Sequence, residues 1–433
     1  MAAAVAISID RLSTLAAVER QRLLRRAGTM PGHVLPAVRE IVRGVRERGD
    51  EALLEYTHRF DGVHLERLEV GPDEYEDAIR AVEPGVLSAL QVAMDNIQTF
   101  HEAQLQPQPV VETRPGVRVW REWRPIDRVG VYVPGGGAVY PSSVLMNAVP
   151  ARVAGCPQII ACSPPNEYGQ IPPETLAAAS MAGVTRFFKL GGAQAVAAMA
   201  YGTQTVPQCL KLYGAGSIWV TAAKLEVFGD ADIDAPAGPS EILIVADETP
   251  DPSMLAADLL AQSEHGPDSA SVLVTTSVEL GEAVAAEVGR QLQELPLRER
   301  TAEALRKYGR ILLVDTLHEA VEFANEYAPE HLEVATEEPE SLLPLIRNAG
   351  SIFLGTHAPV ASGDYATGAN HVLPTGGAAK TFGPLSVESF GRWVQVQSVS
   401  REGLMGLREA LVALAEAEGL DGHARSVDMR FER

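Results

Sequence analysis

The chain carries a glutamine and a histidine three positions apart, Gln262 and His265, in the stretch LLAQSEHGPDS. The apolar pattern before them predicts a helix, and Gly266 is a natural place for that helix to end. Residues three apart on a helix share one face, so a carbonyl oxygen and an imidazole nitrogen can converge there. Alone, the pair is a weak indication of a metal site, because a helix-end histidine is more often structural. It needs partners from elsewhere in the chain.

A second cluster lies in GDYATGANHVLPT, where Asp364 and His371 are seven residues apart and Gly363 and Gly368 loosen the backbone. The cluster follows the predicted strand SIFLG, and α/β enzymes place their binding loops after strands. A functional loop and a structural turn are about equally compatible with this pattern.

Two further signals involve histidines beside carboxylates. Glu330 and His331 are adjacent in APEHLEVA, between a predicted helix and a short strand, and can act as an acid–base pair if they are oriented and partly buried. Read alone, such a dipeptide is ordinary. Glu418 and His423 lie near the C-terminus, where a histidine is usually exposed, although the preceding helix can carry it onto another subunit.

A run of glycines, Gly135, Gly136 and Gly137, follows the apolar strand VGVYV. It resembles a loop that lets a phosphate approach the backbone, but its spacing does not fit GxGxxG. A tight turn between a strand and a helix explains it nearly as well.

Two series of alternating strands and helices have to position these residues. One series runs from Val129 and the other from Glu241, and both are typical of parallel α/β units. Right-handed crossovers then place ligand-binding loops at the carboxyl ends of the strands. The first quarter, roughly residues 8–104, is mostly helical in pattern. Near the C-terminus a helical seam either packs on its own domain or meets another helix; it consists of Leu404, Leu407, Leu411 and Leu414.

Composition restricts the class of protein. The 433 residues carry a net charge of -21, which disfavours binding to nucleic acid or to anionic membranes. No apolar run reaches the length of about 18 residues that a membrane span needs. Cys156, Cys162 and Cys209 form no CxxC motif and suit reduced thiols in a cytoplasmic protein. The N-terminus lacks the basic start of a signal peptide and reads as mature sequence.

Taken in order, seven stretches resemble the histidinol dehydrogenase family from about residue 27 to His423: RVGVYVPGGG, LGGAQAVAA, DAPAGPSEILIVAD, DLLAQSEHGPDS, EYAPEHLEV, GDYATGANHVLPT and AEAEGLDGHA. The resemblance implies two incomplete Rossmann-like parallel α/β domains with small helical segments at both ends. It implies an N-terminal helical segment at 1–27, a first domain at 28–131 and 242–385, an NAD-binding domain at 132–241, and a C-terminal helical tail at 386–433 that is exchanged in a homodimer.

The same resemblance implies the site. One zinc ion per subunit would be held by Gln262, His265, Asp364 and His423 of the partner subunit. Glu330 and His331 would be the acid–base pair. Contacts to substrate would come from these ligands, His331, Ser240, His371 and Glu418, and contacts to NAD from Tyr132, Gln194 and Ser217. The implied reaction is the oxidation of L-histidinol to L-histidine through L-histidinaldehyde with two NAD, which ends histidine biosynthesis.

Two positions depart from the family pattern. The family usually reads GPGN where this chain has Gly214 to Ser217, so a cofactor contact falls to a shorter hydroxyl, and Val360 stands where many members carry Glu. One alternative is therefore a relative that oxidises another small polar alcohol, such as a sulfonated propanediol. Another is an inactive, metal-binding homologue. Tyr365, Asn370 and His371 favour histidinol, and the intact Glu330 and His331 oppose an inactive protein.

Overall fold

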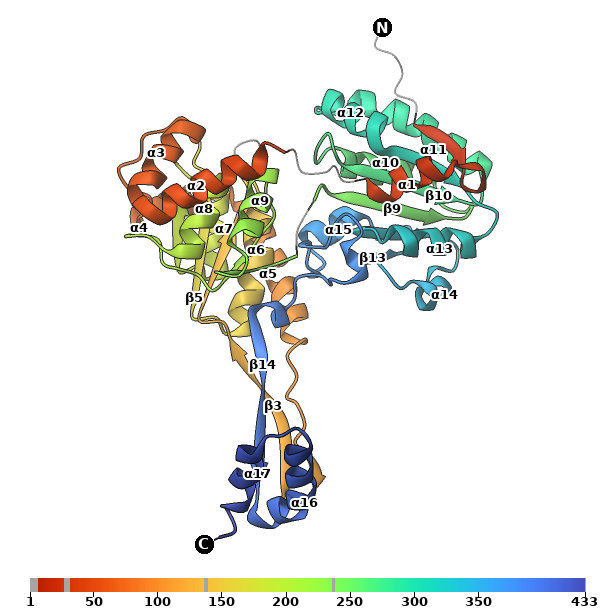
Figure 1. Ribbon diagram of the computed structural model, residues 1–433. Helices are drawn as coiled ribbons and strands as arrows, with labels where there is room; N and C mark the ends of the chain where they lie inside the picture. Colours follow the sequence, from red (N-terminus) through yellow and green to blue (C-terminus); the bar gives the residue numbers. More distant parts are fainter. Residues whose placement is uncertain (1–6, 27–31, 136–138, 236–237, 433) are drawn as a thin grey trace.

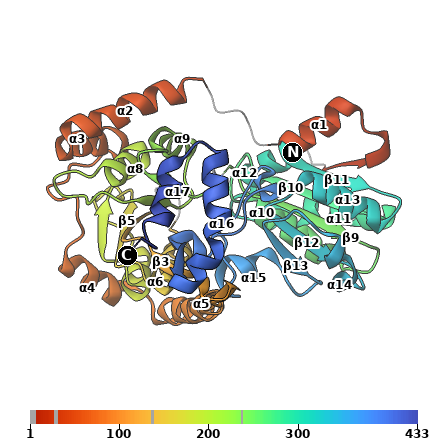
Figure 2. The same cartoon turned by 60° about the horizontal axis from the view of Figure 1, so that its bottom comes forward.

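The computed structural model describes residues 7–26, 32–135, 139–235 and 238–432. Two α/β lobes lie beside each other, and a narrow arm extends away from them (Figure 1). When the bottom of that view is brought forward, the two helices at the end of the arm lie in front of the lobes (Figure 2). We name the lobes by their sheets, as the six-stranded lobe and the five-stranded lobe.

The six-stranded lobe contains residues 7–26 and 238–365 around a parallel sheet of order β1-β11-β10-β9-β12-β13. Its strands are β1 (Ser8–Arg11), β9 (Glu241–Ala246), β10 (Ala270–Thr275), β11 (Gly309–Leu313), β12 (His331–Ala335) and β13 (Ser351–Leu354). Its α-helices are α1 (Ala17–Arg25), α10 (Pro252–Ser263), α11 (Val278–Gln291), α12 (Arg298–Tyr308), α13 (Leu317–Tyr327), α14 (Pro339–Leu342) and α15 (Val360–Tyr365). In β9, Ile242 and Ile244 face α10, whereas Leu243 and Val245 face α13. Both faces are apolar because helices cover both.

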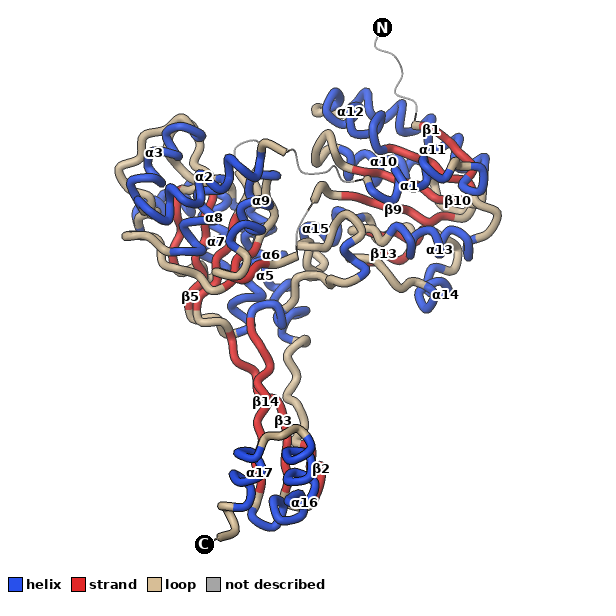
Figure 3. The backbone as a smooth tube through the Cα atoms, in the orientation of Figure 1, coloured by secondary structure: helices blue, strands red, loops and turns tan. Residues whose placement is uncertain are grey.

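The five-stranded lobe surrounds a parallel sheet of order β6-β5-β4-β7-β8. Its strands are β4 (Arg128–Tyr132), β5 (Gln158–Ser163), β6 (Arg186–Lys189), β7 (Lys211–Tyr213) and β8 (Asp232–Ile233). Its helices are α2 (Val34–Arg48), α3 (Asp50–Asp61), α4 (Pro72–Ala81), α5 (Pro84–Glu102), α6 (Pro141–Ala154), α7 (Pro173–Ala182), α8 (Gly192–Tyr201) and α9 (Ile218–Val227). Buried residues of α2, α8 and α9 share one core cluster, and those of α5, α6 and α7 share another. Figure 3 shows the strands of each lobe between their helices.

The arm is an antiparallel sheet with two helices at its end. It consists of β2 (Val111–Arg114), β3 (Val117–Pro125), β14 (Gly391–Val399), α16 (Arg401–Ala417) and α17 (Asp421–Asp428). Strands β3 and β14 pair along their whole length, from Gly391 opposite Pro125 to Val399 opposite Val117. The arm therefore holds the C-terminal helices away from both lobes (Figure 1).

The prediction of a separate N-terminal helical segment at 1–27 is wrong for the residues that the structure describes. Strand β1 pairs in parallel with β11 at the edge of the six-stranded sheet, and α1 packs on α13. Ile7 and Leu12 are buried in two core clusters on opposite faces of that sheet. The segment belongs to the lobe because its apolar residues complete the lobe's core.

The expected grouping of residues 28–131 with 242–385 is also wrong. Helix α2 packs on α8 and α9, α4 on α7 and α5 on α6, so these helices cover the five-stranded sheet. Strand β4 pairs with β5 and β7 of the same sheet. The five-stranded lobe therefore begins far ahead of residue 132, and β9 already belongs to the other lobe from Glu241 onwards. Helical patterns alone do not tell which sheet a helix covers.

The C-terminal segment 386–433 is not entirely helical as predicted, because it contains the nine-residue strand β14. The leucine seam divides into two parts. Leu404 and Leu407 are half-buried, whereas Leu411 and Leu414 are 37% and 64% exposed. Packing within the arm thus accounts for only the first half of the seam.

The parallel α/β character of both lobes confirms the fold class expected from the alternating pattern. No described helix is long and apolar enough to span a membrane. The three cysteines are free and buried, as expected for structural thiols.

Candidate active site

Glu330 and His331 lie where the chain enters β12, and they are only 5% and 4% exposed. Ser240 and Glu241 occupy the matching place at the start of the neighbouring strand β9. These residues come before their strands, so the site lies at the amino edge of the six-stranded sheet. The expectation that ligands bind at the carboxyl edge is wrong for this lobe.

Helix α10 explains how the site forms at this edge. It follows β9 and precedes the parallel strand β10, so it runs back from the carboxyl edge and ends near the start of β10. Its last turn carries Gln262, and His265 follows directly. Helix α15 carries Asp364 and packs against α10. Three of the expected metal ligands thus come from two adjoining helices of one lobe.

His331 is held as a neutral base. Its Nδ1 lies 2.9 Å from the backbone oxygen of Glu241, so the Nδ1–H group donates to that oxygen and Nε2 keeps its lone pair. Nε2 is buried without a hydrogen-bond partner, 3.8 Å from Oδ1 of Asp364. Burial, together with the nearby His265 and His371, lowers the pKa of His331 to about 4. Nε2 is therefore free to take a proton from a substrate hydroxyl.

Glu330 lies beside this base, with Oε2 3.5 Å from Nδ1 of His331. The Glu330 carboxylate accepts the backbone N–H of Glu241 at 2.8 Å and also a hydrogen bond from the Ser240 side chain. Burial raises the pKa of Glu330 well above its usual value. A buried carboxyl group with a raised pKa holds a proton more readily than an exposed one, as acid–base catalysis requires.

Gln262 is 1% exposed, and neither its amide oxygen nor its amide nitrogen has a hydrogen-bond partner. His265 is exposed, and its Nδ1 lies 3.2 Å from the backbone oxygen of Ala261, which leaves Nε2 available. Burial raises the pKa of Asp364 to about 6, while His265 opposes this rise. A buried amide without a hydrogen-bond partner lowers the stability of the fold by about 1–3 kcal/mol. Such a group is therefore expected where a bound ion or ligand supplies the partner.

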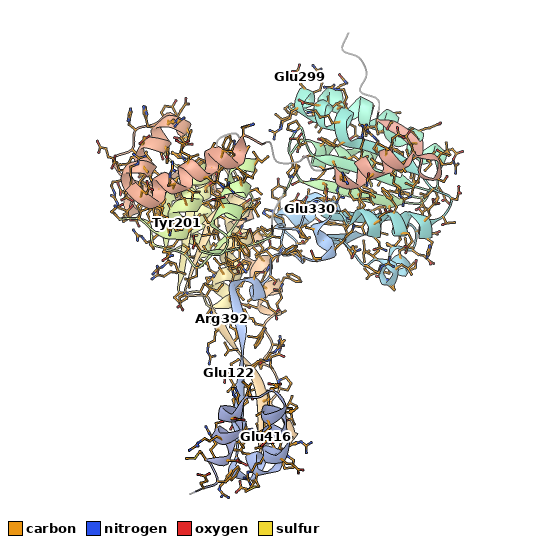
Figure 4. The ribbon with its side chains drawn as sticks, in the orientation of Figure 1. Glu122, Tyr201, Glu299, Glu330, Arg392 and Glu416 are labelled. Atoms are coloured by element: carbon orange, nitrogen blue, oxygen red, sulfur yellow. The ribbon has the colours of Figure 1, made fainter. Side chains whose placement is uncertain are left out.

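The structure brings His371 to the same place, because its Nδ1 lies 3.0 Å from the backbone oxygen of Asp364. Burial lowers the pKa of His371 to about 4, so this imidazole is also neutral. Within one chain, His423 and Glu418 are not part of the cluster. Both residues are exposed on the arm. Figure 4 shows Glu330 in the six-stranded lobe and Glu416, which shortly precedes Glu418 and His423 in the chain, at the far end of the arm.

The side chains of one copy do not complete a conventional ion site. Across the described ranges, no three His, Cys, Asp or Glu side chains lie close enough together to hold a metal ion. The expected set of one amide, two imidazoles and one carboxylate includes Gln262, and its second imidazole, that of His423, does not reach the cluster within one chain. Oxygen and imidazole donors of this kind suit zinc.

The expected cofactor residues gather at the carboxyl edge of the five-stranded sheet, as predicted. Tyr132 ends β4, Gln194 lies in the first turn of α8, and Ser217 precedes α9. The Tyr132 hydroxyl accepts the backbone N–H of Gly192 at 3.1 Å. Ser217 is exposed and its side chain caps no helix, so its hydroxyl is available. In the glycine run, Gly136 and Gly137 lie outside the described residues.

Sequence reasoning missed three charged residues around these sites. Asp61, at the end of α3, lies against Gly191 at the carboxyl edge of the five-stranded sheet, and burial raises its pKa to about 6. Arg26 and Glu241 form a buried ion pair beneath Glu330. The one sequence signal for Glu241 is an acidic residue at the head of an otherwise apolar strand, and Arg26 gave none.

Comparison with known proteins gives the family. Residues 24–431 match the family model described as histidinol dehydrogenase. The chain belongs to the histidinol dehydrogenase family. It is therefore an enzyme, an oxidoreductase.

Relatives within the histidinol dehydrogenase family cover nearly the whole chain. The histidinol dehydrogenase of Methanothermobacter thermautotrophicus is 49% identical over 409 residues, which are 94% of this chain and 96% of that protein. The histidinol dehydrogenase of Methanosarcina mazei is 46% identical over 97% of both chains. The crystal structure of histidinol dehydrogenase from Elizabethkingia anophelis has 38% identity and a TM-score of 0.94, and the match covers 98% of this chain and 97% of that one. The likeness thus includes both lobes and the arm.

Proposed function

We propose that this protein oxidises L-histidinol to L-histidine through L-histidinaldehyde, with two successive hydride transfers to NAD, as the last steps of histidine biosynthesis. The observation that carries the proposal is the buried, unpaired Nε2 of His331, 3.8 Å from Asp364 and beside the buried carboxyl of Glu330. A base and an acid held together in this way suit an alcohol oxidation followed by hydration of an aldehyde.

We further propose one zinc ion per subunit, held by Gln262, His265, Asp364 and His423 of the partner subunit. The support is the buried Gln262 amide, whose oxygen has no partner, and the free Nε2 of His265 beside Asp364. When bound, zinc would fix the amino and imidazole nitrogens of histidinol and so hold its carbinol carbon in place.

In the first step, Nε2 of His331 takes the proton of the substrate hydroxyl while hydride leaves the carbinol carbon. In the second step, Glu330 takes a proton from water as the water oxygen bonds to the aldehyde carbon, and protonated His331 returns its proton to the aldehyde oxygen, which gives the hydrate. Neutral His331 then takes a proton from one hydroxyl of the hydrate as the second hydride leaves for NAD, which gives the carboxylic acid, and this acid loses its proton to solvent. The hydrogen bond from His331 Nδ1–H to Glu241 fixes the imidazole orientation throughout.

Ser240 and His371 would contact the substrate from this chain, and Glu418 of the partner subunit would contact it from a second copy. The arm supports pairing of two copies because it places apolar side chains in solvent. These exposed side chains are Met405, Leu411, Leu414 and Leu420. A homodimer would cover them and bring His423 of the partner subunit to the cluster that lacks it.

NAD would lie at the carboxyl edge of the five-stranded sheet against Tyr132, Gln194 and Ser217, where it accepts the hydride. The segment from Ile233 to Glu241 spans at most about 30 Å, so this edge and the amino edge that carries Glu330 cannot be far apart. A shorter Ser217 hydroxyl in place of an amide would weaken one NAD contact, so Ser217→Asn should lower the KM for NAD.

Steady-state assay of the zinc-loaded protein with histidinol and NAD tests the proposal. We expect two NADH for each histidinol and the product histidine. No NADH from histidinol, in protein shown to contain zinc, would overturn it. Competition between amino alcohols and sulfonated diols shows which of the two substrate classes the protein prefers. A protein inactive on every alcohol tested would indicate a homologue without activity.

A further inference from the structure

Glu241 contacts the catalytic pair through its backbone and its side chain. Its backbone N–H donates to Oε2 of Glu330 at 2.8 Å, and its backbone oxygen accepts from His331 at 2.9 Å. Its side-chain Oε1 accepts the backbone N–H of Glu330 at 3.2 Å and that of Gly376 at 3.1 Å. Glu241, which is 2% exposed, thus fixes the backbone and the carboxyl of Glu330 and the tautomer of His331. It also holds Gly376, in the segment that follows His371.

The charge of Glu241 is balanced by Arg26, which follows the last residue of α1. Arg26 is 8% exposed and binds both carboxylate oxygens of Glu241, with Nη2 2.6 Å from Oε1 and Nε in contact with Oε2. Its guanidinium lies 3.5 Å from the centre of the Tyr327 ring. Such a planar, two-pronged contact fixes a carboxylate in one orientation.

Arg26 also holds the chain that leads into the catalytic pair. Its Nη2 donates to the backbone oxygen of Ala328 at 3.2 Å. Ala328 has a φ of +50°, and no other non-glycine residue within the described ranges lies in the left-handed region. A left-handed alanine is strained and needs surrounding contacts to persist. The turn between α13 and Glu330 is therefore fixed by a residue from the N-terminal segment.

We infer that Arg26 and Glu241 are positioning residues of the active site, which lock Glu330 and His331 in their working geometry. The inference rests on the proposed function, in which Glu330 acts on water and His331 acts on the substrate hydroxyl. Without the guanidinium, the Glu241 carboxylate would be an unbalanced charge in the core, and it would either leave its place or take up a proton. The first change removes the acceptor of the Glu330 and Gly376 backbone N–H groups, and the second weakens it.

A purely structural ion pair would change stability alone, and a matched control separates the two roles. Arg20 lies on α1, the helix that leads to Arg26, and pairs with Glu326 of α13. It therefore also joins α1 to α13, but it contacts no site residue. Arg20→Met therefore removes an arginine bridge between the same two helices and should leave kcat unchanged.

The experiment compares Arg26→Met, Arg26→Lys, Glu241→Gln and Arg20→Met in zinc-loaded protein. With histidinol and, separately, with histidinaldehyde as substrate, we expect Arg26→Met to lower kcat about 100-fold and to change KM little, because misplacement of a catalytic group acts mainly on the chemical step. Arg26→Lys keeps the charge but not the two-pronged contact, so it should recover part of the rate. Glu241→Gln keeps the shape and tests the charge if Arg26→Met does not fold.

An Arg26→Met or Glu241→Gln protein with a lowered melting temperature and the full kcat would overturn the inference. A crystal structure of a folded variant gives a readout that does not depend on histidinol. Displacement of the Glu330 carboxyl and the His331 ring supports the inference, and unchanged positions contradict it, whatever substrate the wild type uses. Inactivity of the wild type itself would count against the proposed function instead.

Discussion

Asn370 donates from Nδ2 to the backbone oxygen of Met146 at 2.7 Å, and this bond joins the two lobes. Asn370 lies in the loop that follows α15 of the six-stranded lobe, whereas Met146 belongs to α6 of the five-stranded lobe. Asn96 of α5 makes a second such bond, from Nδ2 to the backbone oxygen of Ala366 at 2.7 Å. The loop between Asp364 and His371 is therefore held by the lobe expected to bind the cofactor.

Asn96→Ala should loosen this loop and raise the KM for histidinol about fivefold, the equivalent of one lost hydrogen bond. The KM for NAD should change less, because no proposed cofactor contact is touched. Steady-state kinetics with each substrate varied in turn measures both values. Gln91→Ala, on the exposed side of the same helix, is the control and should have no effect. Equal changes in the two KM values would argue against a local effect on the loop.

Gln262→Leu should weaken zinc binding more than about tenfold, without lowering the stability of the metal-free protein. The reason is that the buried amide has no partner to lose, and an apolar group of similar shape avoids its desolvation. Metal content after dialysis and thermal unfolding of the metal-free form test the two halves. Gln293→Leu, at an exposed glutamine, should keep its zinc. A large loss of stability without metal would mean that the amide has a partner in solution.

Inactive His423→Ala and Gln262→Ala chains should regain activity when they are unfolded, mixed and refolded together. Each mixed dimer would contain one intact site, so random pairing should restore about one quarter of wild-type activity. Activity as a function of mixing ratio measures this. A lack of recovery in dimers shown to be mixed would place the whole site in one chain.

His331→Asn should lower kcat about 100- to 10,000-fold for histidinol, because it removes the unpaired Nε2 that takes the hydroxyl proton. Zinc content and the KM for NAD should be nearly unchanged. His318→Asn, an exposed histidine on α13, serves as the matched control. Turnover equal to that of the wild type would remove His331 from the role of base.

Glu333→Gln should stabilise the protein at pH 8 more than at pH 5. Glu333 is buried in β12, and burial together with nearby Asp258 raises its pKa from 4.5 to about 9. Between those values the folded protein retains a proton that the unfolded chain has lost, so stability falls as pH rises through this window. Glutamine removes that dependence. Melting temperatures from pH 5 to pH 8 measure it, with exposed Glu340→Gln as the control; parallel curves for Glu333→Gln and wild type would contradict the shift.

Much of the local structure could be predicted from the sequence, because each lobe repeats apolar strands between helical segments. The pattern could not show which sheet each helix covers. Ile41 and Val45 of α2 are buried residues at helical spacing, and nothing in that spacing distinguishes a partner in one lobe from a partner in the other. The hairpin of β2 and β3 gives no clear strand pattern, because β2 is exposed and Val117 is the one fully buried residue of β3.

The site could be predicted from the sequence only through the family resemblance and through residue types that commonly take part in catalysis. Glu330, His331 and Asp364 have such types, and the structure places them together. Arg26 has no such mark, because an arginine at the end of a polar helix is usually solvated and its partner Glu241 lies in a distant part of the chain. Long-range pairing of this kind depends on topology, which local patterns do not contain.

The position of strand β1 affects the order in which parts of the molecule fold. Ser8 is synthesised before the five-stranded sheet, whereas the strand it joins, at Arg310, is synthesised after that sheet. Closing so long a loop is slow, and non-local contacts of this kind form late in folding. Arg26 lies in the same early segment and reaches Glu241 only when that closure is complete. A newly made chain would therefore acquire its catalytic competence at the end of folding, when the segment from Ser8 to Arg26 meets its neighbours.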